Sequence, residues 1–178
     1  MKYGVSLYLI FKDEAPFLKE WIDYHKLIGV AHFYLYNNDS ADNFREVLSP
    51  YIEQGLVTLI DFPSRNMQIS SYKDCYKRFR GETNWLCSLD ADEFICMTEK
   101  RDIHEWLKDY DKYPAVVMNF LHFGTGGRLK HDFSRLVIEQ YTSCQAGLFG
   151  VEKTFVNTRF DLSPKPTVRA FPFPCASL

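Results

Sequence analysis

The first 92 residues alternate between short apolar runs and longer stretches with helical spacing, and this alternation limits the fold more than any other feature of the sequence. The apolar runs have strand length and carry almost no charge, as expected for strands buried on both faces of a sheet. This order predicts βαβ units and an α/β fold, in which helices cover both faces of a mostly parallel sheet. The predicted strands are residues 5–11, 31–36, 56–61 and 85–90, and the predicted helices are residues 13–29, 43–48 and 67–80.

Cap and turn residues set the limits of the first two predicted helices. Asp13 is a suitable N-cap, Pro16 falls in the first turn, and Gly29 supplies a stop at the C-terminus of the first helix. We expect the second helix to stop before Pro50, because a proline inside a helix removes a backbone hydrogen bond.

The pattern changes after the fourth predicted strand. The later elements are predicted as a helix at residues 103–110, strands at residues 115–123 and 135–142, and a glycine-rich loop between these strands, either a flexible substrate loop or an ordinary turn. The tail holds four prolines and is predicted to be irregular. We therefore predict one domain over residues 1–160 and an irregular extension over residues 161–178.

The charge balance argues against a nucleic-acid-binding protein. The chain of 178 residues has 21 basic and 23 acidic residues and a net charge of −2, whereas nucleic-acid binders usually show a basic excess or stripe. The one basic cluster, residues 72–81, has the spacing of a solvated helix face, which we favour over a phosphate-binding role. We expect no nucleic-acid partner.

Cysteine usage and hydropathy favour a reducing compartment. The five cysteines form no CxxC pair, so neither a disulfide framework nor a zinc site is indicated, and Cys87 and Cys96 are expected to be small core residues. The N-terminus lacks a cleavage site for a signal peptide, and no window approaches the roughly 18 apolar residues of a membrane span. We expect a cytoplasmic protein, or one bound peripherally at a membrane, without a transmembrane segment.

All four predicted strands of the first half end in polar residues. In an open α/β sheet, ligands bind beyond the carboxyl ends of the strands. Alternate residues of an extended segment point to the same side, so Asp90 and Asp92 in "DADE" are placed to face one ion. Proteins typically hold Mg²⁺ or Mn²⁺ with one or two carboxylates plus substrate phosphates. The strand ends are residues 12–14, 37–40, 61–66 and 90–93.

Different interpretations of these motifs stay open or lose support. A lone DxD is common by chance and also fits a turn cap followed by solvated acids, but its place at the end of the fourth strand favours a metal site. The EF-hand pattern, the Walker glycine loop and GxGxxG are missing from the sequence, which weighs against an EF-hand calcium site, nucleotide hydrolysis and hydride transfer. The five histidines form no HExxH motif or close pair, so each is expected to be structural or solvent-exposed.

Three segments resemble a known family. "FKDEAPFLKEWIDYHKLIGVAHFYLYNNDSAD", "WLCSLDADEF" and "RLVIEQYT" look like the GT-A glycosyltransferases of the family-92 and family-2-like type, in the same order and over most of the chain. The resemblance implies a Rossmann-like GT-A fold and a metal-dependent transferase that uses Mn²⁺ or Mg²⁺. It also implies inverting transfer of a sugar from a nucleotide-diphosphate donor, expected to be a UDP-sugar, to a glycan, a lipid-linked acceptor or another hydroxyl acceptor.

The resemblance also implies site residues. Asp92 matches the direct metal ligand, and Asp90 matches the DxD residue nearer the ribose. Trp21 and His25 match the family as well, but on a helix they are expected to be core residues. The donor-binding positions implied are Lys12, Asp13, Glu14, Asn37, Asn38, Asp39, Gln68 and Asp90, and the metal-binding positions are Asp90 and Asp92.

The sequence indicates the acceptor-binding residues less clearly than the donor-binding residues. A general base is expected after the DxD, and Asp132 is the candidate, with Glu139 and His131 behind it. Enzymes of this fold often complete the metal site from the C-terminal segment, but Asp161 is the only aspartate there, so a truncated or weakened enzyme is one hypothesis. A glycan- or nucleotide-sugar-binding module is a second hypothesis. A nucleotidyltransferase is a third, although the sequence lacks the basic glycine-rich loop expected near the first strand of such an enzyme.

Overall fold

The computed structural model describes the backbone of residues 1–63, 68–98, 102–144, 149–161 and 168–177, and the side chains of these residues apart from 149–152 and 168–177. The helices are α1 (Ala15–Leu27), α2 (Phe44–Glu53), α3 (Gln68–Phe79), α4 (Ile103–Lys108) and α5 (Val137–Gln140). The strands are β1 (Tyr3–Phe11), β2 (His32–Asn37), β3 (Val57–Asp61), β4 (Thr83–Ser88), β5 (Glu93–Ile95), β6 (Ala115–Gly124), β7 (Ser143–Cys144), β8 (Phe149–Asn157) and β9 (Val168–Ser177).

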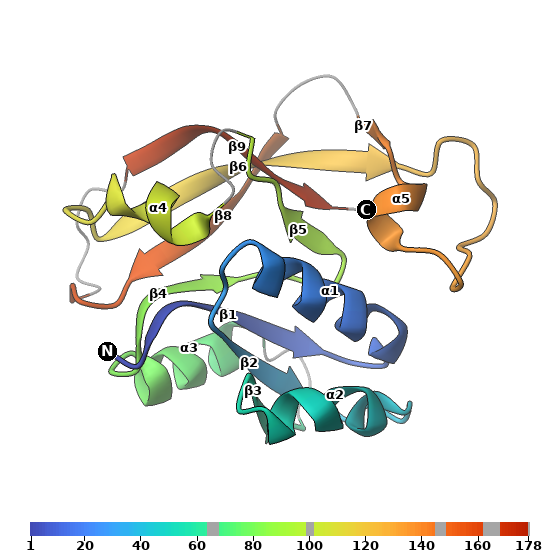
Figure 1. Ribbon diagram of the computed structural model, residues 1–178, viewed down its shortest axis with the longest axis horizontal. Coiled ribbons are helices and arrows are strands. Elements are labelled where there is room, and N and C mark those ends of the chain that lie inside the picture. The colour runs from blue at the N-terminus through green and yellow to red at the C-terminus, as the bar shows by residue number, and fades with distance from the viewer. Residues whose placement is uncertain (64–67, 99–101, 145–148, 162–167, 178) are drawn as a thin grey trace.

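The strands form one sheet in the order β3-β2-β1-β4-β8-β6-β9-β5, and β7 pairs with β6 beside this path. The first four strands are parallel, as predicted, so their carboxyl ends share one edge. Strand β8 then runs antiparallel to both β4 and β6, which joins the parallel half to a mixed half. Figure 1 shows α1 and α2 on one face of the parallel half and α3 on the other.

The alternation of side chains along β1 explains why helices cover both faces. Leu7 and Leu9 are buried in the cluster beneath α1, where they join Leu18 and Ile22. Tyr8 points to the other face and is buried beside Cys75 of α3. Each face therefore buries apolar side chains, and the prediction of a sheet covered on both sides is confirmed.

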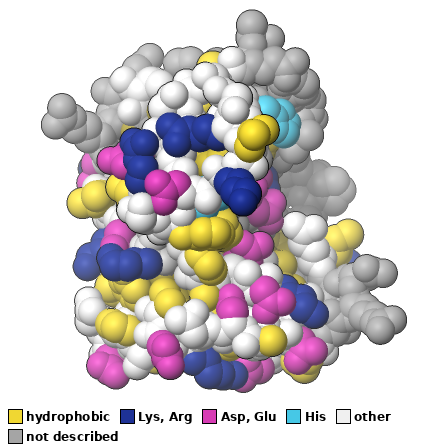
Figure 2. All heavy atoms as spheres, turned by 90° about the vertical axis from the view of Figure 1, so that its right-hand side faces the viewer, with side chains coloured by type: hydrophobic (Ala, Val, Ile, Leu, Met, Phe, Trp, Pro, Cys, Tyr) yellow, Lys and Arg dark blue, Asp and Glu magenta, His cyan; other side chains and the backbone are white. Residues whose placement is uncertain are grey.

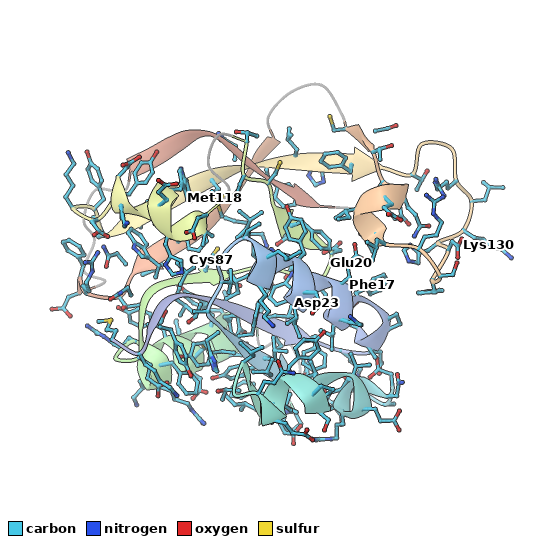
Figure 3. The ribbon with its side chains drawn as sticks, viewed as in Figure 1. Phe17, Glu20, Asp23, Cys87, Met118 and Lys130 are labelled. Atoms are coloured by element: carbon cyan, nitrogen blue, oxygen red, sulfur yellow. The ribbon has the colours of Figure 1, made fainter. Side chains whose placement is uncertain are left out.

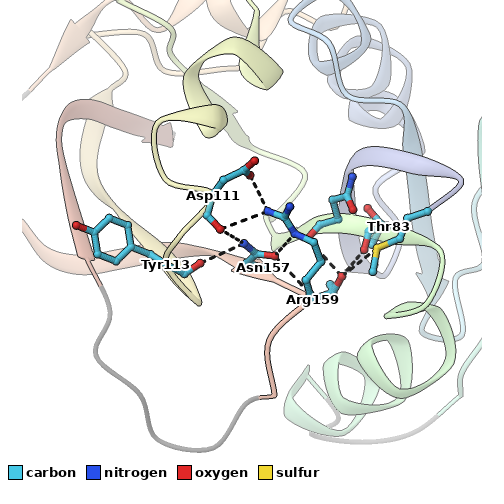
Figure 4. Close-up of polar contacts among 8 residues, drawn as sticks. Thr83, Asp111, Tyr113, Asn157 and Arg159 are labelled. Carbon is cyan, nitrogen blue, oxygen red and sulfur yellow. Dashed lines mark hydrogen bonds and ion pairs between the residues drawn. The ribbon is translucent and has the colours of Figure 1, made fainter.

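A polar network fixes the far end of β8 (Figure 4). The Asn157 side-chain amide donates to the backbone carbonyls of Asp111 and Tyr113, each at 3.2 Å. Its carbonyl oxygen accepts from the Arg159 Nε at 3.0 Å, and Arg159 also pairs with the Asp111 carboxylate at 2.6 Å. These bonds tie β8 to the turn before β6, and every polar atom of the buried Asn157 side chain has a partner.

Two predictions about α1 and α2 were wrong. Asp13 does not cap α1: it has a positive φ of 57°, and Glu14 occupies the N-cap position instead. Helix α2 does not stop before Pro50 but continues to Glu53. The buried Tyr51 packs in the core one residue after the proline, and this packing outweighs the one hydrogen bond that the proline removes.

Two predictions about the second half were also wrong. Residues 135–142 were expected to form a strand, but they contain α5, whose first backbone N–H groups donate to the carboxylate of Glu20 on α1. The proline-rich tail was expected to be irregular, but residues 168–177 form β9 between β6 and β5, with a register irregularity opposite residues 117–119. The division into a domain and an extension stays a prediction.

Two expectations about cysteines and membranes can be compared with the described residues. Cys87 is buried and Cys96 is half-buried, and the described cysteines are free thiols. Within the described ranges, no helix is both long and apolar enough to cross a membrane.

Candidate functional site

The carboxyl ends of the parallel strands border two neighbouring clefts. The first, which we call the acidic cleft, has a volume of about 450 Å³ and contains the predicted carboxylates Glu14, Asp90 and Asp92. The second, which we call the amide cleft, has a volume of about 570 Å³ and contains Asn38 and Gln68. Both clefts are also lined by Lys12 and Asp90, so five predicted donor-binding residues and both predicted metal ligands surround one continuous region.

A short turn holds the two aspartates after β4. The Asp90 N–H donates to the carboxylate of Glu93 at 2.8 Å, and the Glu93 N–H donates back to the Asp90 carbonyl at 3.1 Å. Glu93 is only 4% exposed, so its charge requires a partner. The turn thus depends on a buried carboxylate three residues beyond its start.

Lys153 of β8 is the cation that meets these acids. Its Nζ lies 2.6 Å from the Glu93 carboxylate and 3.0 Å from Oδ2 of Asp90. Burial by itself would lower the pKa of Lys153, but the bonds to Glu93 and Asp90 outweigh burial and raise it, so the ammonium stays charged. Lys153 was not predicted from the sequence, because the signal is one lysine in a mostly apolar stretch far beyond the DxD.

Helix α1 holds the segment that follows the DxD. The Trp21 indole donates to the Glu93 carbonyl at 3.0 Å, and the Tyr24 hydroxyl donates to the Ile95 carbonyl at 2.8 Å. His25 bonds the Trp21 carbonyl through Nδ1 at 2.8 Å and the Ile95 N–H through Nε2 at 3.3 Å. Burial lowers the pKa of His25 to about 3, so the ring is neutral and can donate at Nδ1 while it accepts at Nε2. The prediction that Trp21 and His25 are core residues is confirmed.

The acidic cleft has an excess of negative charge. Burial, and then the neighbouring Asp92, Asp42 and Asp90, raise the pKa of Glu14. Burial and Asp90 likewise raise the pKa of Asp92. Carboxylates that are partly buried near one another are stabilised by a bound cation, and oxygen ligands suit Mg²⁺ or Mn²⁺.

The described residues contain no group of three or more His, Cys, Asp or Glu side chains arranged to hold a metal ion. The oxygen ligands available to a metal ion at the cleft are therefore the carboxylate of Asp92 and the Asp90 oxygen that Lys153 does not contact. Such a set fits a hard divalent cation whose remaining ligands are water and substrate phosphates. Asp161 does not extend this set, because its exposed carboxylate pairs with Arg80 at 3.0 Å.

Three of the predicted donor-binding residues line neither cleft. The carboxylate of Asp13 accepts from the Ala41 N–H at 2.7 Å, which ties the loop after β1 to the loop after β2. Asn37 is 6% exposed and donates to Asp61 at 2.8 Å. Asp39 is exposed, with a positive φ of 60°. In this structure Asp13 and Asn37 shape the loops around the clefts.

The predicted base, Asp132, lies outside the acidic cleft. Its Oδ1 accepts from the Ser134 hydroxyl at 2.6 Å and from the Ser134 N–H at 3.0 Å, and these bonds lower the pKa of the exposed carboxyl. His131 and Tyr141 are the residues of this segment that line the cleft. Glu139 is exposed on α5. The role of Asp132 as a base stays a prediction, and its geometry weighs against it.

Residues 124–142 pack against one end of α1. Figure 3 shows Phe17 and Glu20 on the part of α1 that lies nearest to α5, and Lys130 on the adjoining loop. The Phe17 ring meets the His131 ring edge-on, with centroids 5.4 Å apart. Figure 2 shows the face of the molecule on this side, where acidic, basic and apolar side chains are interleaved.

Comparison with known proteins identifies the family to which this chain belongs. The model of glycosyltransferase family 92 matches residues 2–159. The chain belongs to this family. A family 92 protein of Oryza sativa subsp. japonica is 31% identical over 132 residues, which cover 72% of this chain and 23% of the relative. Galactan beta-1,4-galactosyltransferase GALS3 of Arabidopsis thaliana is 32% identical over 120 residues, with 62% and 23% coverage. This family 92 chain therefore spans about a quarter of the length of these relatives.

Solved structures of GT-A glycosyltransferases share the fold of this family 92 chain. S. aureus TarS in complex with UDP has a TM-score of 0.55 at 10% identity and is matched over 72% of this chain and 38% of its own. GalNAc-T7 with UDP, GalNAc and Mn²⁺ has a TM-score of 0.50 at 16% identity, over 68% of this chain and 24% of its own. The predicted GT-A fold is confirmed.

Proposed function

We propose that this chain contains the donor site of a glycosyltransferase that moves a sugar from a UDP-sugar to a hydroxyl group of a glycan. The observation that carries the proposal is the pair of carboxylates after β4, which line a cleft where burial and neighbouring acids raise the pKa of Glu14 and of Asp92. Membership of family 92 supports the reaction class, and the UDP and Mn²⁺ of the GalNAc-T7 structure support the donor and metal. The galactan galactosyltransferase relative supports a glycan acceptor.

Each cleft has a distinct part in this proposal. Asn38 and Gln68 in the amide cleft would hydrogen-bond the nucleoside, and Lys12, which lines both clefts, would meet the diphosphate. Asp92, with the oxygen of Asp90 that Lys153 leaves free, would hold Mn²⁺ or Mg²⁺. A metal ion bound there would stabilise negative charge on the departing diphosphate. Lys153 and Glu93 keep Asp90 fixed while the donor binds.

Metal-dependent nucleotide binding tests this proposal. Thermal denaturation is measured with UDP-, GDP- and CDP-sugars, each with and without Mn²⁺. We expect a stabilisation by at least one UDP-sugar that requires the metal and is lost in Asp92→Ala. Asp161→Asn is the control, since that aspartate is exposed and pairs with Arg80. The donor-site proposal is overturned if none of these nucleotides stabilises the chain or if Asp92→Ala keeps the full shift.

A nucleotide-sugar-binding module without catalysis is the second candidate function. It is favoured by the finding that the described residues contain no group of three metal ligands. Release of UDP from a UDP-sugar in the presence of Mn²⁺ distinguishes the two functions, because a binding module binds the nucleotide-sugar but does not cleave it. A cytoplasmic or peripherally membrane-bound location stays a prediction.

A further inference from the structure

The acidic cleft is lined by two kinds of side chain. Besides the carboxylates described above, it is lined by the rings of Phe17, His131 and Tyr141, which we call the ring wall. A sugar acceptor has hydroxyl edges and apolar C–H faces, so a cleft that combines ionic and aromatic side chains matches it. The ring wall belongs to the same cleft as Asp92 and therefore lies beside the place proposed for the reacting diphosphate.

The ring wall is held rigidly. The His131 and Tyr141 rings are stacked, with centroids 5.9 Å apart and an angle of 9° between their planes. His131 Nδ1 lies 3.1 Å from the Tyr141 hydroxyl, and the Phe17 ring meets the His131 ring edge-on. The next residue is fixed too, because the side chain of Gln140 bonds both the N–H and the carbonyl of Asp132. The imidazole is thus oriented by contacts on several sides.

We propose that His131 is the group that takes the proton from the acceptor hydroxyl, and that Phe17 and Tyr141 form the wall against which the acceptor sugar lies. This inference rests on the proposed function and names the acceptor side of the same site. Of the two neighbouring candidates, His131 lines the cleft, whereas the carboxylate of Asp132 is engaged by Ser134 outside it.

The hydrogen bond to Tyr141 is compatible with the tautomer that the proposal requires. When Nδ1 carries the hydrogen and donates it to the Tyr141 oxygen, Nε2 has the lone pair that accepts a proton. The acceptor O–H bond then breaks and its proton moves to Nε2, while the oxygen forms a bond to the anomeric carbon. The bond from the anomeric carbon to the phosphate oxygen breaks, and its electron pair leaves with the diphosphate. His131 ends as imidazolium, stabilised by its bond to Tyr141.

Several charged or titratable groups share the surroundings of His131. They are Lys12, Glu14, Asp90, Asp92 and Tyr141 in the cleft, and Asp132 next in the chain. A pH profile of one variant is therefore interpretable only beside a profile of the unchanged chain. A base at His131 must be neutral to accept the proton, so the rate falls at low pH, and replacement of His131 removes that acidic limb.

The test compares His131→Gln with Asp132→Asn, the rival base, and with Tyr141→Phe. UDP release from UDP-galactose is measured with Mn²⁺, with and without a β-1,4-linked galacto-oligosaccharide. We expect His131→Gln to lower kcat by about 10²- to 10⁴-fold and to lose the acidic limb of the pH profile. Tyr141→Phe should give a smaller loss with a displaced limb, and Asp132→Asn a smaller loss without displacement.

Donor binding separates failure of this inference from failure of the proposed function. Stabilisation by Mn²⁺ and UDP should be the same in His131→Gln and in the unchanged chain, which also shows that the variant is folded. If the unchanged chain is not stabilised, the proposed function fails. If it is stabilised but Asp132→Asn loses turnover and His131→Gln keeps it, or if the unchanged chain releases no UDP, the assignment of His131 is overturned.

Discussion

Strand β8 contributes to two polar clusters that balance their charges differently. Around Asn157, every polar atom of the buried side chain has a partner, and the nearby Arg159 and Asp111 pair with each other. Around Lys153, one ammonium pairs with the two carboxylates of Asp90 and Glu93, and in the adjoining cleft the pKa of Glu14 and of Asp92 is raised by burial and by neighbouring acids. The first cluster is complete as it stands, whereas the second is left with negative charge that a bound cation would neutralise.

This difference separates structural from functional polar groups. Fully partnered buried groups stabilise a fold and give it a unique arrangement. Perturbed carboxylates at the ends of strands lower the stability of the free protein and indicate a ligand site. The balance between the clusters leads to predictions on stability that require no knowledge of the acceptor.

The largest effect is expected for Lys153→Met. This change leaves Glu93 buried without its cation, and removal of one partner of a buried ion pair typically costs about 3–5 kcal/mol. Chemical denaturation measures the loss in the free energy of unfolding. The double variant Lys153→Met with Glu93→Gln should recover much of it, because glutamine still accepts from the Asp90 N–H. Lys112→Met, at an exposed lysine, is the matched control. Equal losses of stability in Lys153→Met and in Lys112→Met would show that Lys153 supports no buried charge.

An intermediate effect is expected for Asn157→Ala. The carbonyls of Asp111 and Tyr113 lose the two hydrogen bonds from the Asn157 amide, and one such bond contributes about 0.5–1.5 kcal/mol. Arg159→Ala should cost less, since its ion pair is partly exposed. Chemical denaturation again provides the measurement. A stabilising effect of Asn157→Ala would contradict the description of this cluster as complete.

The smallest effect, and one of opposite sign, is expected for Glu14→Gln. Its folded pKa is raised above the ordinary carboxyl value, so the protonated form favours folding, and that contribution is lost as the pH rises through the folded pKa. The melting temperatures of the two chains should therefore coincide below about pH 4 and separate above it, with the variant more stable. Thermal melting curves of both chains, measured over a range of pH, check this prediction. A Glu14→Gln variant that is less stable than the unchanged chain at neutral pH would contradict the excess of negative charge in the acidic cleft.

The part of the site that the sequence could predict depends on local pattern. Asp90 and Asp92 follow an apolar strand, and strand ends of a parallel sheet share one edge, so their convergence with Lys12 and Glu14 was predictable. The long-range partners were not. Lys153 reaches Asp90 and Glu93 only because β8 enters the sheet antiparallel beside β4, and no local pattern specifies that pairing.

The errors in the fold have the same origin. The alternation of residues 135–142 suggested a strand, but the carboxylate of Glu20, more than a hundred residues earlier, supplies the acceptor for the first N–H groups of α5. Asp13 and Asn37 have side chains suited to ligand binding, yet each is used by the neighbouring loop or strand. A tertiary contact decided each case.

The most direct test of the central claim is the effect of Asp92→Asn on stability with and without ligand. The substitution removes a charge and keeps the shape of the side chain. We expect the melting temperature of the free chain to rise, because the substitution removes a charge that burial and the neighbouring Asp90 disfavour, and we expect the stabilisation by Mn²⁺ with UDP to disappear. A free chain that becomes less stable and a ligand-dependent shift that persists would contradict the claim that this acid cluster is completed by a metal-bound nucleotide.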